Sequence, residues 1–295
     1  MSNNTPKISV IMSVYNCFPF LSESIKSVLV QPLKDFELII VDDSSTDKSI
    51  EIIRKFMEKD KRIKLIKNKK NIGLTKSLNK GLKIAKGKYI ARIDTDDISL
   101  PNRFQIQYQF MKENPNIFLT GGTAIIIDEN EKEIKKYKPI TNEGKLKKIL
   151  KKCNAICHST IMFKNEKNNF YREKFYYSQD YDFYLKMLSE GKRLLNIPDV
   201  LIKYRITPEA ISSLQRTKQK LFAEKAKEFY LQRLKTGKDK YESFNPNDIL
   251  SRLDSTYQYF PDIGTRNELI EKYDIKDKIV LEKEIGPYKF FKFVD

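Results

Sequence analysis

The sequence predicts an α/β protein built on a largely parallel sheet, and three observations support this fold class. Strand-like and helix-like hydrophobic patterns alternate over about the first 100 residues. Strand, helix and strand repeated at this spacing imply right-handed crossovers and parallel strands. Carboxylates cluster at 94–97, directly after an apolar run, and open α/β sheets bind their ligands at that edge.

The elements of this first part are expected in a simple order. Apolar runs predict strands at 8–14, 36–41, 63–66 and 89–93. Helices are predicted between them, because apolar residues recur there at helical spacing: Leu21, Ile25, Val28 and Leu29, then Ile50, Ile53 and Met57, then Leu78, Leu82 and Ala85. The first 100 residues or so therefore resemble a nucleotide-binding half-domain.

The pattern becomes mixed further along the chain. We expect a helix marked by Phe104, Tyr108 and Met111, strands at 117–121, 123–127 and 156–163, and a helix that follows Asp180. Beyond about Pro208 the pattern is that of a basic amphipathic helix, with one stripe formed by Phe222, Ala226, Phe229, Tyr230 and Leu234. We therefore divide the chain into a main domain at 1–207 and a basic, mainly helical region at 208–295.

Composition permits an enzyme of ordinary size. The chain has 295 residues, of which 40% are hydrophobic, so it can bury a sizeable core. It contains no apolar run of about 18 residues and its N-terminus lacks signal-peptide features, so we expect a soluble, cytoplasmic protein. The odd cysteine count, with Cys17, Cys153 and Cys157, fits a reducing compartment. Cys153, Cys157 and His158 lack a second ligand pair, which disfavours a structural zinc site.

The net charge of +17 admits three explanations: nucleic acid, an anionic membrane surface, or lysine-rich coding bias without a function. Nucleic acid is the weakest of the three, because aromatic residues are not interleaved with glycine and basic residues as in an RNA-binding sheet. No nucleic-acid partner is expected. Membrane contact and coding bias both stay open.

The most informative motif is Asp94-Thr95-Asp96-Asp97. Clustered carboxylates repel one another unless they share a cation, and carboxylate oxygens are ligands for Mg²⁺ or Mn²⁺. The motif therefore predicts a metal site at the carboxyl edge of the sheet. The alternative is an acidic turn in which Asp97 or Ser99 caps the next helix.

Polar residues also follow the first two predicted strands. Asp43 emerges after the second strand, where its carboxylate can accept from a base imide or a ribose hydroxyl. Ser13 and Tyr15 lie at the end of the first strand, where a ring and backbone groups can flank a base. No glycine-rich dinucleotide fingerprint or P-loop is present, so a nucleotide must be held by another scheme.

Two further positions are candidates for acid–base chemistry. Asp180 and Asp182 lie at a predicted helix start, where the helix dipole favours the ionised carboxylate of a general base. The alternative for either residue is a helix cap. His158 is the one histidine in the chain, and a lone histidine at the start of an apolar strand is more often structural than catalytic.

Taken in order, these segments resemble the inverting family 2 glycosyltransferases with the GT-A fold. The resemblance covers about residues 7–205, and Asp94-Thr-Asp-Asp97 matches the DxD element of that family. The other matching pieces lie at 8–16, 41–47, 71–74, 77–81, 85–90 and 158–163. The resemblance implies a mixed, largely parallel sheet flanked by helices, with a nucleotide-sugar half at about 7–100, an acceptor half at about 101–207 and a C-terminal helical appendage.

The resemblance also implies roles on the donor side. Asp43 would contact the nucleoside base, expected to be uracil, and Ser13 and Tyr15 would line the base pocket. Lys76 would belong to the nucleotide-sugar site, and Asp94 would face the ribose or the sugar.

Further roles concern the metal and the acceptor. Asp96, helped by Asp97, would hold Mn²⁺ or Mg²⁺ on the diphosphate. Asp180 falls where the family has its general base, and Gln179 replaces the glutamate that usually precedes this base. His158 and Gln179 would lie on the acceptor side.

These roles imply a metal-dependent transfer of one sugar, with inversion, from a nucleotide-sugar to a saccharide or lipid-linked glycan acceptor. UDP-sugar is the expected donor, and assembly of a bacterial-type surface glycan is the expected setting. The chain has no tryptophan and so lacks the Gln-x-x-Arg-Trp element of processive synthases. The basic C-terminal region would allow peripheral contact with an anionic membrane. The rival functions are a sugar nucleotidyltransferase, which should show a Gly- and Arg-rich phosphate loop, and a non-catalytic basic binding protein.

Overall fold

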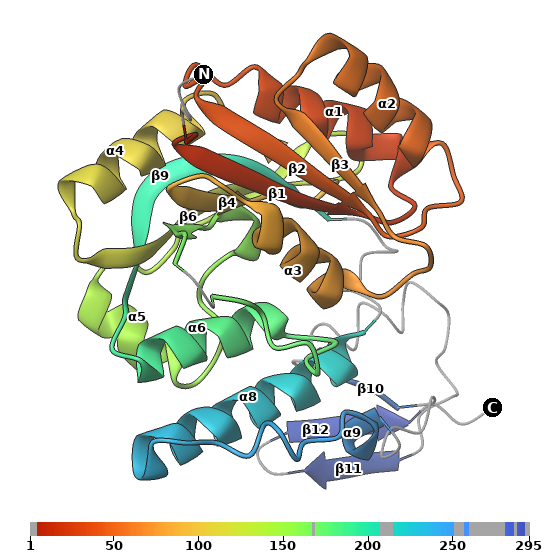
Figure 1. The fold of residues 1–295 in the computed structure, drawn as a ribbon. Coiled ribbons are helices and arrows are strands. Elements are labelled where there is room, and N and C mark those ends of the chain that lie inside the picture. The colour runs from red at the N-terminus through yellow and green to blue at the C-terminus, as the bar shows by residue number, and fades with distance from the viewer. Residues whose placement is uncertain are drawn as a thin grey trace.

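The large sheet of the computed structural model has nine strands (Figure 1). The structure describes residues 5–166, 169–206, 215–250, 257–259, 281–285 and 288–292. The strands of the large sheet are β1 (Ile8–Val14), β2 (Phe36–Asp42), β3 (Ile63–Lys67), β4 (Tyr89–Arg92), β5 (Ile98–Ser99), β6 (Ile117–Ile127), β7 (Glu133–Tyr137), β8 (Met162–Lys164) and β9 (Arg193–Arg205). Their order is β3-β2-β1-β4-β8-β6-β9-β5, and β7 pairs with β6.

Helices cover both faces of this sheet (Figure 1). They are α1 (Phe18–Leu29), α2 (Ser49–Lys59), α3 (Leu74–Ile84), α4 (Arg103–Glu113), α5 (Glu143–Leu150), α6 (Gln179–Ser189), α8 (Arg216–Thr236) and α9 (Asn247–Leu250). A second, three-stranded sheet is formed by β10 (Tyr257–Tyr259), β12 (Tyr288–Lys292) and β11 (Leu281–Ile285). No helix within the described ranges is long and apolar enough to cross a membrane.

The first four strands confirm the predicted parallel sheet. β1 pairs in parallel with both β2 and β4, and β2 pairs in parallel with β3. β8 lies antiparallel between β4 and β6 and so divides this half from the parallel pair β6 and β9. Parallel strands end at one edge, so the loops after β1, β2 and β4 meet there.

Alternating side chains of the strands build two cores. Val10, Met12 and Val14 of β1 pack with apolar residues of α1, α2 and α4 on one face. Ile11 of β1 packs on the opposite face with residues of α3, α5, α6 and α8. This alternation is the period of two expected of a strand that is buried on both faces.

Three of the expected strands differ in the structure. Residues 156–163 do not form one strand: the 3₁₀-helix η1 (His158–Thr160) precedes β8. The Cys157 carbonyl accepts from the Thr160 backbone N–H (3.0 Å) and from the Thr160 hydroxyl (2.7 Å), which closes this turn. The two strands expected at 117–121 and 123–127 form the single strand β6, whose register to β9 shifts around Gly121.

The C-terminal region packs on the same core as the main domain. Phe222, Ala226, Phe229 and Tyr230 of α8 are buried with residues of α6, as the predicted stripe requires. Leu234 was wrongly assigned to that stripe, since its side chain is 56% exposed. The expected boundary near Pro208 lies outside the described residues. The small sheet was not predicted, and neither were β7, α5 and β9.

Gly87→Ala should destabilise the protein, because a Cβ at this position would lie 2.3 Å from the Ser9 backbone nitrogen. The Gly87 N–H already donates to the Ser9 hydroxyl at 2.7 Å, so the two segments cannot move apart freely. We expect the free energy of unfolding to fall by about 1–3 kcal/mol, measured by urea denaturation. Gly144→Ala is the matched control, because its Cβ would meet an atom at an ordinary 3.5 Å; an equal loss in both variants would contradict this explanation.

Candidate active site

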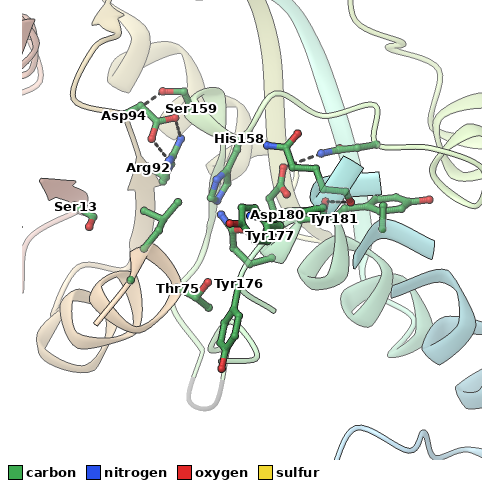
Figure 2. A pocket seen from close by; sticks show the side chains of 18 of the residues that line it. Ser13, Thr75, Arg92, Asp94, His158, Ser159, Tyr176, Tyr177, Asp180 and Tyr181 are labelled. Atoms are coloured by element: carbon green, nitrogen blue, oxygen red, sulfur yellow. Dashed lines mark hydrogen bonds and ion pairs between the residues drawn. The ribbon is translucent and has the colours of Figure 1, made fainter. Parts of the chain in front are cut away.

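One cavity of about 1400 Å³ opens at the carboxyl edge of the parallel strands (Figure 2). Loops after β1, β2 and β4 line one side of it, and the segment from η1 to α6, together with α8, lines the other. The predicted site residues that line this cavity are Ser13, Tyr15, Asp43, Lys76, Asp94, Asp96, His158, Gln179 and Asp180. Asp97 is not among the lining residues, and its side chain is fully buried.

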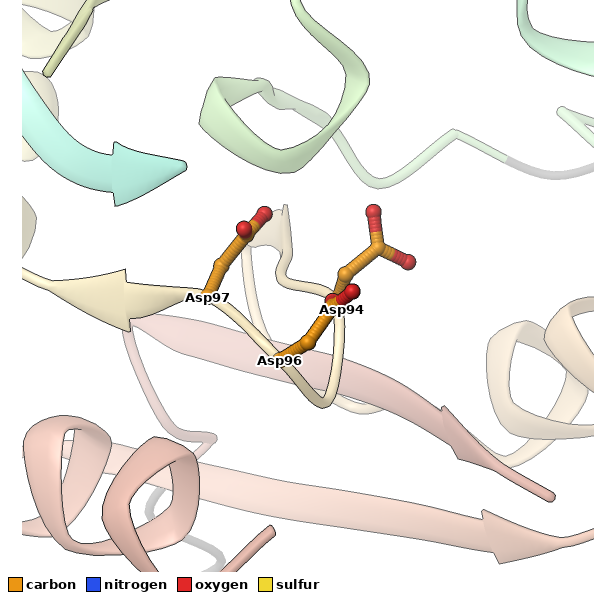
Figure 3. Close-up of side chains that lie close together, drawn as sticks. All are labelled: Asp94, Asp96 and Asp97. Atoms are coloured by element: carbon orange, nitrogen blue, oxygen red, sulfur yellow. The ribbon is translucent and has the colours of Figure 1, made fainter. Parts of the chain in front are cut away.

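The three carboxylates of the acidic loop, Asp94, Asp96 and Asp97, lie together (Figure 3). One oxygen atom of each lies within 4.8 Å of the others. Burial, and then the charge of Asp94, raises the pKa of Asp96 to about 6. Burial, and then the charges of Asp96 and Asp94, raise the pKa of Asp97 well above its usual range. Mutual repulsion of this kind is relieved when carboxylates share a cation.

Arg92 is the direct partner of Asp94. The two guanidinium nitrogens of this buried arginine donate to the two carboxylate oxygens of Asp94. The Asp94 backbone N–H donates to the hydroxyl of Ser159 in η1 at 2.9 Å. The ion pair fixes the orientation of Asp94, and Figure 2 shows all three residues on one wall of the cavity.

Arg205, at the end of β9, holds the other two residues of the acidic loop. Its backbone N–H donates to Asp97 Oδ1 (2.9 Å) and its Nε donates to the Asp96 carbonyl (3.0 Å). Its remaining guanidinium nitrogens donate to the Asp128 carbonyl (3.2 Å) and to Glu23 Oε2 (2.7 Å). One buried arginine thus joins the acidic loop to the β6–β7 hairpin and to α1.

The donor atoms of the acidic loop fit a hard divalent cation. Mg²⁺ and Mn²⁺ prefer oxygen ligands, and the loop offers three carboxylates. Asp97 Oδ2 is buried and has no hydrogen-bond partner, although buried polar atoms are normally satisfied. The alternative of a helix cap is wrong for Ser99, which lies in β5, and α4 begins instead after Asn102.

Asp43 organises the loop that follows β3. Its Oδ1 accepts from Asn68 Nδ2 (2.8 Å) and from the Ile72 backbone N–H (2.9 Å), and its Oδ2 accepts from the Gly73 backbone N–H (2.8 Å). A carboxylate oxygen has two acceptor sites, so Oδ2 keeps one site for another donor. Asp43 therefore shapes this end of the cavity and can also bind a ligand there.

The other donor-side residues differ in exposure. Tyr15 is 48% exposed, Lys76 is exposed, and Ser13 is half-buried at the end of β1. Cys17 lies beside them, and the Thr95 hydroxyl contacts its sulfur at 2.8 Å, which links the β1 loop to the acidic loop. An exposed ring next to polar groups suits a flat ligand such as a base.

Asp180 lies in the first turn of α6 and faces the cavity (Figure 2). Burial raises its pKa, and a hydrogen bond from Asn154 Nδ2 (2.7 Å) to its Oδ2 acts in the opposite direction. Ser178 is the N-cap residue of α6, so Asp180 is not the cap. Asp182 is fully buried and paired with Arg172, which gives it a structural role.

His158 and Gln179 both border the same end of the cavity. His158 Nε2 lies 2.8 Å from the Tyr171 hydroxyl, and burial lowers the pKa of the imidazole well below its usual range. The ring is therefore neutral near pH 7. Gln179, the first residue of α6, is buried beside Asp180 and adds no charge to it.

Four contributors to the site were not predicted: Arg92, Asn154, Ser159 and Arg205. A signal existed for Arg92, because it is a charged residue inside an apolar run that ends at the acidic loop. Ser159 falls within the strand expected at 156–163, and nothing in that pattern marks it as a site residue. Asn154 and Arg205 reach their partners across long stretches of chain, so no local pattern marks them.

Comparison with known proteins agrees with this geometry. A family profile described as Glycosyl transferase family 2 matches residues 9–179. The uncharacterized glycosyltransferase MJ1057 of Methanocaldococcus jannaschii is 41% identical over 224 residues, which cover 74% of this chain and 77% of that protein. An Escherichia coli relative, named UDP-Glc:alpha-D-GlcNAc-diphosphoundecaprenol beta-1,3-glucosyltransferase WfaP, is 34% identical over 209 residues, which cover 70% of this chain and 80% of that protein.

Solved structures share the fold. TarS 1-349 of S. aureus in complex with UDP-GlcNAc matches with a TM-score of 0.58 and 18% identity, over 90% of this chain and 79% of that one. The mannosyltransferase PcManGT of Pyrobaculum calidifontis in complex with GDP-Man and Mn²⁺ matches with a TM-score of 0.56 and 14% identity, over 92% of this chain and 80% of that one. At these identities the likeness shows the fold alone, which is that of the GT-A glycosyltransferases.

Proposed function

The chain belongs to glycosyl transferase family 2, and on that premise we propose that it moves one sugar from a UDP-sugar to a hydroxyl group of a saccharide or lipid-linked glycan acceptor. The transfer inverts the anomeric configuration and depends on a divalent cation. One observation carries the proposal: a single cavity is lined by Asp43, by Asp94 and Asp96 of the acidic loop, and by Asp180.

Asp180 supplies the general base. An acceptor hydroxyl is a weak nucleophile, and a carboxylate within hydrogen-bond reach removes its proton as it attacks the anomeric carbon. Burial raises the pKa of Asp180, which strengthens it as a base, while the Asn154 side chain fixes its orientation. A single displacement opposite to the leaving group inverts the anomeric carbon, so an α-linked donor gives a β-linked product.

The acidic loop binds the leaving-group side of the donor. A divalent cation held by Asp96 and Asp97 would neutralise the charge that develops on the departing diphosphate. Arg205 holds both residues through its backbone and side chain, and Arg92 keeps Asp94 ion-paired. Asp43 offers its free acceptor site to the base, and the exposed ring of Tyr15 flanks the base plane.

Related proteins support the substrate class. The WfaP name specifies UDP-Glc as donor and a diphosphoundecaprenol-linked acceptor, and the TarS structure contains UDP-GlcNAc. Other relatives are named for amylovoran and O-antigen biosynthesis. From these names we carry over to this chain only the substrate class, which is a UDP-sugar donor and a glycan acceptor. When that acceptor is lipid-linked, the basic C-terminal region would bring the protein to an anionic membrane.

Thermal stability in the presence of nucleotides tests this proposal. A ligand that binds the native state raises the midpoint of unfolding. With Mn²⁺ present, UDP and UDP-sugars should stabilise the protein more than GDP- or dTDP-sugars do. Equal stabilisation by all nucleotides, or by none, would contradict the proposed donor class.

Asn154→Ala should move the acid limb of the pH–activity profile to higher pH. The protonated carboxyl of Asp180 cannot accept the acceptor proton, so activity is lost as the pH falls through its pKa. The hydrogen bond from Asn154 lowers the pKa of Asp180, so removing this bond should raise the pKa. The measurement is kcat/KM against pH, with Asn114→Ala, an exposed residue outside the cavity, as control. An unchanged acid limb in Asn154→Ala would exclude Asp180 as the titrating group.

A further inference from the structure

We infer that Tyr176 is the stacking platform for a pyranose ring of the acceptor, an inference that rests on the proposed glycosyl transfer. Tyr176 lies in the segment between β8 and α6, four positions before Asp180, and lines the cavity. An aromatic ring presents a flat apolar face, and a pyranose presents a matching face of C–H groups. The site would therefore select a cyclic sugar rather than a simple alcohol.

Tyr176 differs from most residues of the cavity in the exposure of its ring, and from Tyr15 in its position. Of the exposed large hydrophobic side chains in the described ranges, Tyr15 and Tyr176 line the cavity, and each is 48% exposed. A half-exposed ring in a concave site is typical of a residue that binds a ligand. Tyr15 follows β1 on the donor side, next to the loop of Asp43, whereas Tyr176 belongs to the segment that leads into the helix of Asp180.

Hydrogen bonds anchor residues on either side of Tyr176 to two helices. The Thr75 hydroxyl of α3 donates to the Phe175 carbonyl at 2.7 Å, and the Ser178 hydroxyl donates to the Gln219 carbonyl of α8 at 2.8 Å. The Tyr176 ring also packs against Phe222, with ring centroids 6.1 Å apart. A ring held in this way loses little conformational entropy when a ligand binds, so its contact area contributes directly to affinity.

Polar groups of the same segment line the cavity together with Tyr176 and can bind sugar hydroxyls. Glu173 lines the cavity three positions earlier, and its Oε1 is held by Asn79 Nδ2 at 3.2 Å. Tyr177 follows directly and also lines the cavity. Figure 2 shows the Tyr176 ring extending away from Asp94, and so away from the acidic loop that would hold the donor diphosphate. A cavity that offers an exposed aromatic ring and the Glu173 carboxylate suits an uncharged sugar better than a second nucleotide.

The test uses the full-length protein, saturated with UDP and Mn²⁺, and methyl β-glycosides of glucose, galactose and N-acetylglucosamine as probes. Binding is measured by saturation-transfer NMR. At least one glycoside should bind, with the strongest saturation on the C–H protons of one ring face. Tyr176→Ala should raise the Kd of that glycoside about tenfold, Tyr176→Phe should change it less than about twofold, and Tyr176→Leu should behave like the alanine variant.

Two controls separate this inference from the proposed function. Tyr15→Ala should weaken UDP binding and leave glycoside binding unchanged, and Tyr176→Ala should show the reverse. The role proposed for Tyr176 is wrong if UDP and Mn²⁺ stabilise the protein but no glycoside binds. It is also wrong if Tyr176→Ala binds glycosides as the wild type does. In both cases the proposed UDP-sugar donor is unaffected. If UDP fails to bind the wild type, the proposed function itself is wrong.

Discussion

Asp180→Asn should lower kcat by about 100- to 10,000-fold, the usual contribution of a general base. Asparagine keeps the size of the side chain and can still contact Asn154, but its amide cannot accept a proton from the acceptor hydroxyl. Binding of UDP should stay within about twofold of wild type, because the substitution leaves the three carboxylates of the acidic loop in place. The measurement is the rate of UDP release at saturating donor and acceptor.

Asp182→Asn is the matched control, since it makes the same change two positions away. The Asp182 carboxylate is buried and paired with Arg172. Its removal should therefore lower the midpoint of thermal unfolding and leave kcat at low temperature within about tenfold of wild type. Full activity of Asp180→Asn would show that another group is the base.

Asp96→Ala should abolish the effect of Mn²⁺ on UDP binding. The wild-type protein should bind UDP at least about 100-fold more tightly with Mn²⁺ than with EDTA, because a cation held by Asp96 and Asp97 would offset the negative charge of the diphosphate. In Asp96→Ala the two Kd values should be equal. Isothermal titration calorimetry measures both values directly.

The control for this variant removes a carboxylate elsewhere. Asp199 is exposed on β9 and does not line the cavity, so Asp199→Ala should retain the dependence on Mn²⁺. If wild-type protein bound UDP equally well in EDTA, the acidic loop would not be a metal site. In that case the ion pair of Arg92 with Asp94 and the contacts of Arg205 would be what compensates the charge of the loop among the described residues.

The local hydrophobic pattern of the sequence was sufficient to predict the nucleotide-binding half of the fold. β1 to β4 are short, apolar and separated by amphipathic helices, so their type and order follow from hydrophobic spacing alone. β9 was missed because its thirteen residues combine apolar, charged and proline positions, and its strand character comes from pairing with β6. η1 was missed because the side chain of Thr160 closes a turn within an otherwise strand-like sequence.

The site residues also divide into those that a local sequence pattern marks and those that depend on contacts between distant segments. Asp43, Asp96 and Asp180 could be selected because each lies at a predicted strand end or helix start and also matches a position in the pattern of the family that the sequence resembles. The residues that orient them could not, since their contacts join distant parts of the chain. Arg205 lies 109 positions from Asp96, and Asn154 lies 26 positions from Asp180. Such contacts exist only after the chain has folded.

The anomeric configuration of the sugar released by slow transfer to water tests the central claim most directly, and it requires no knowledge of the acceptor. Purified protein is incubated with Mn²⁺ and an α-linked UDP-sugar that stabilises it, and ¹H NMR follows the free sugar before mutarotation. An inverting transferase with Asp180 as base should release UDP and produce the β-anomer first. Initial release of the α-anomer, or no release of UDP, would contradict the proposed mechanism.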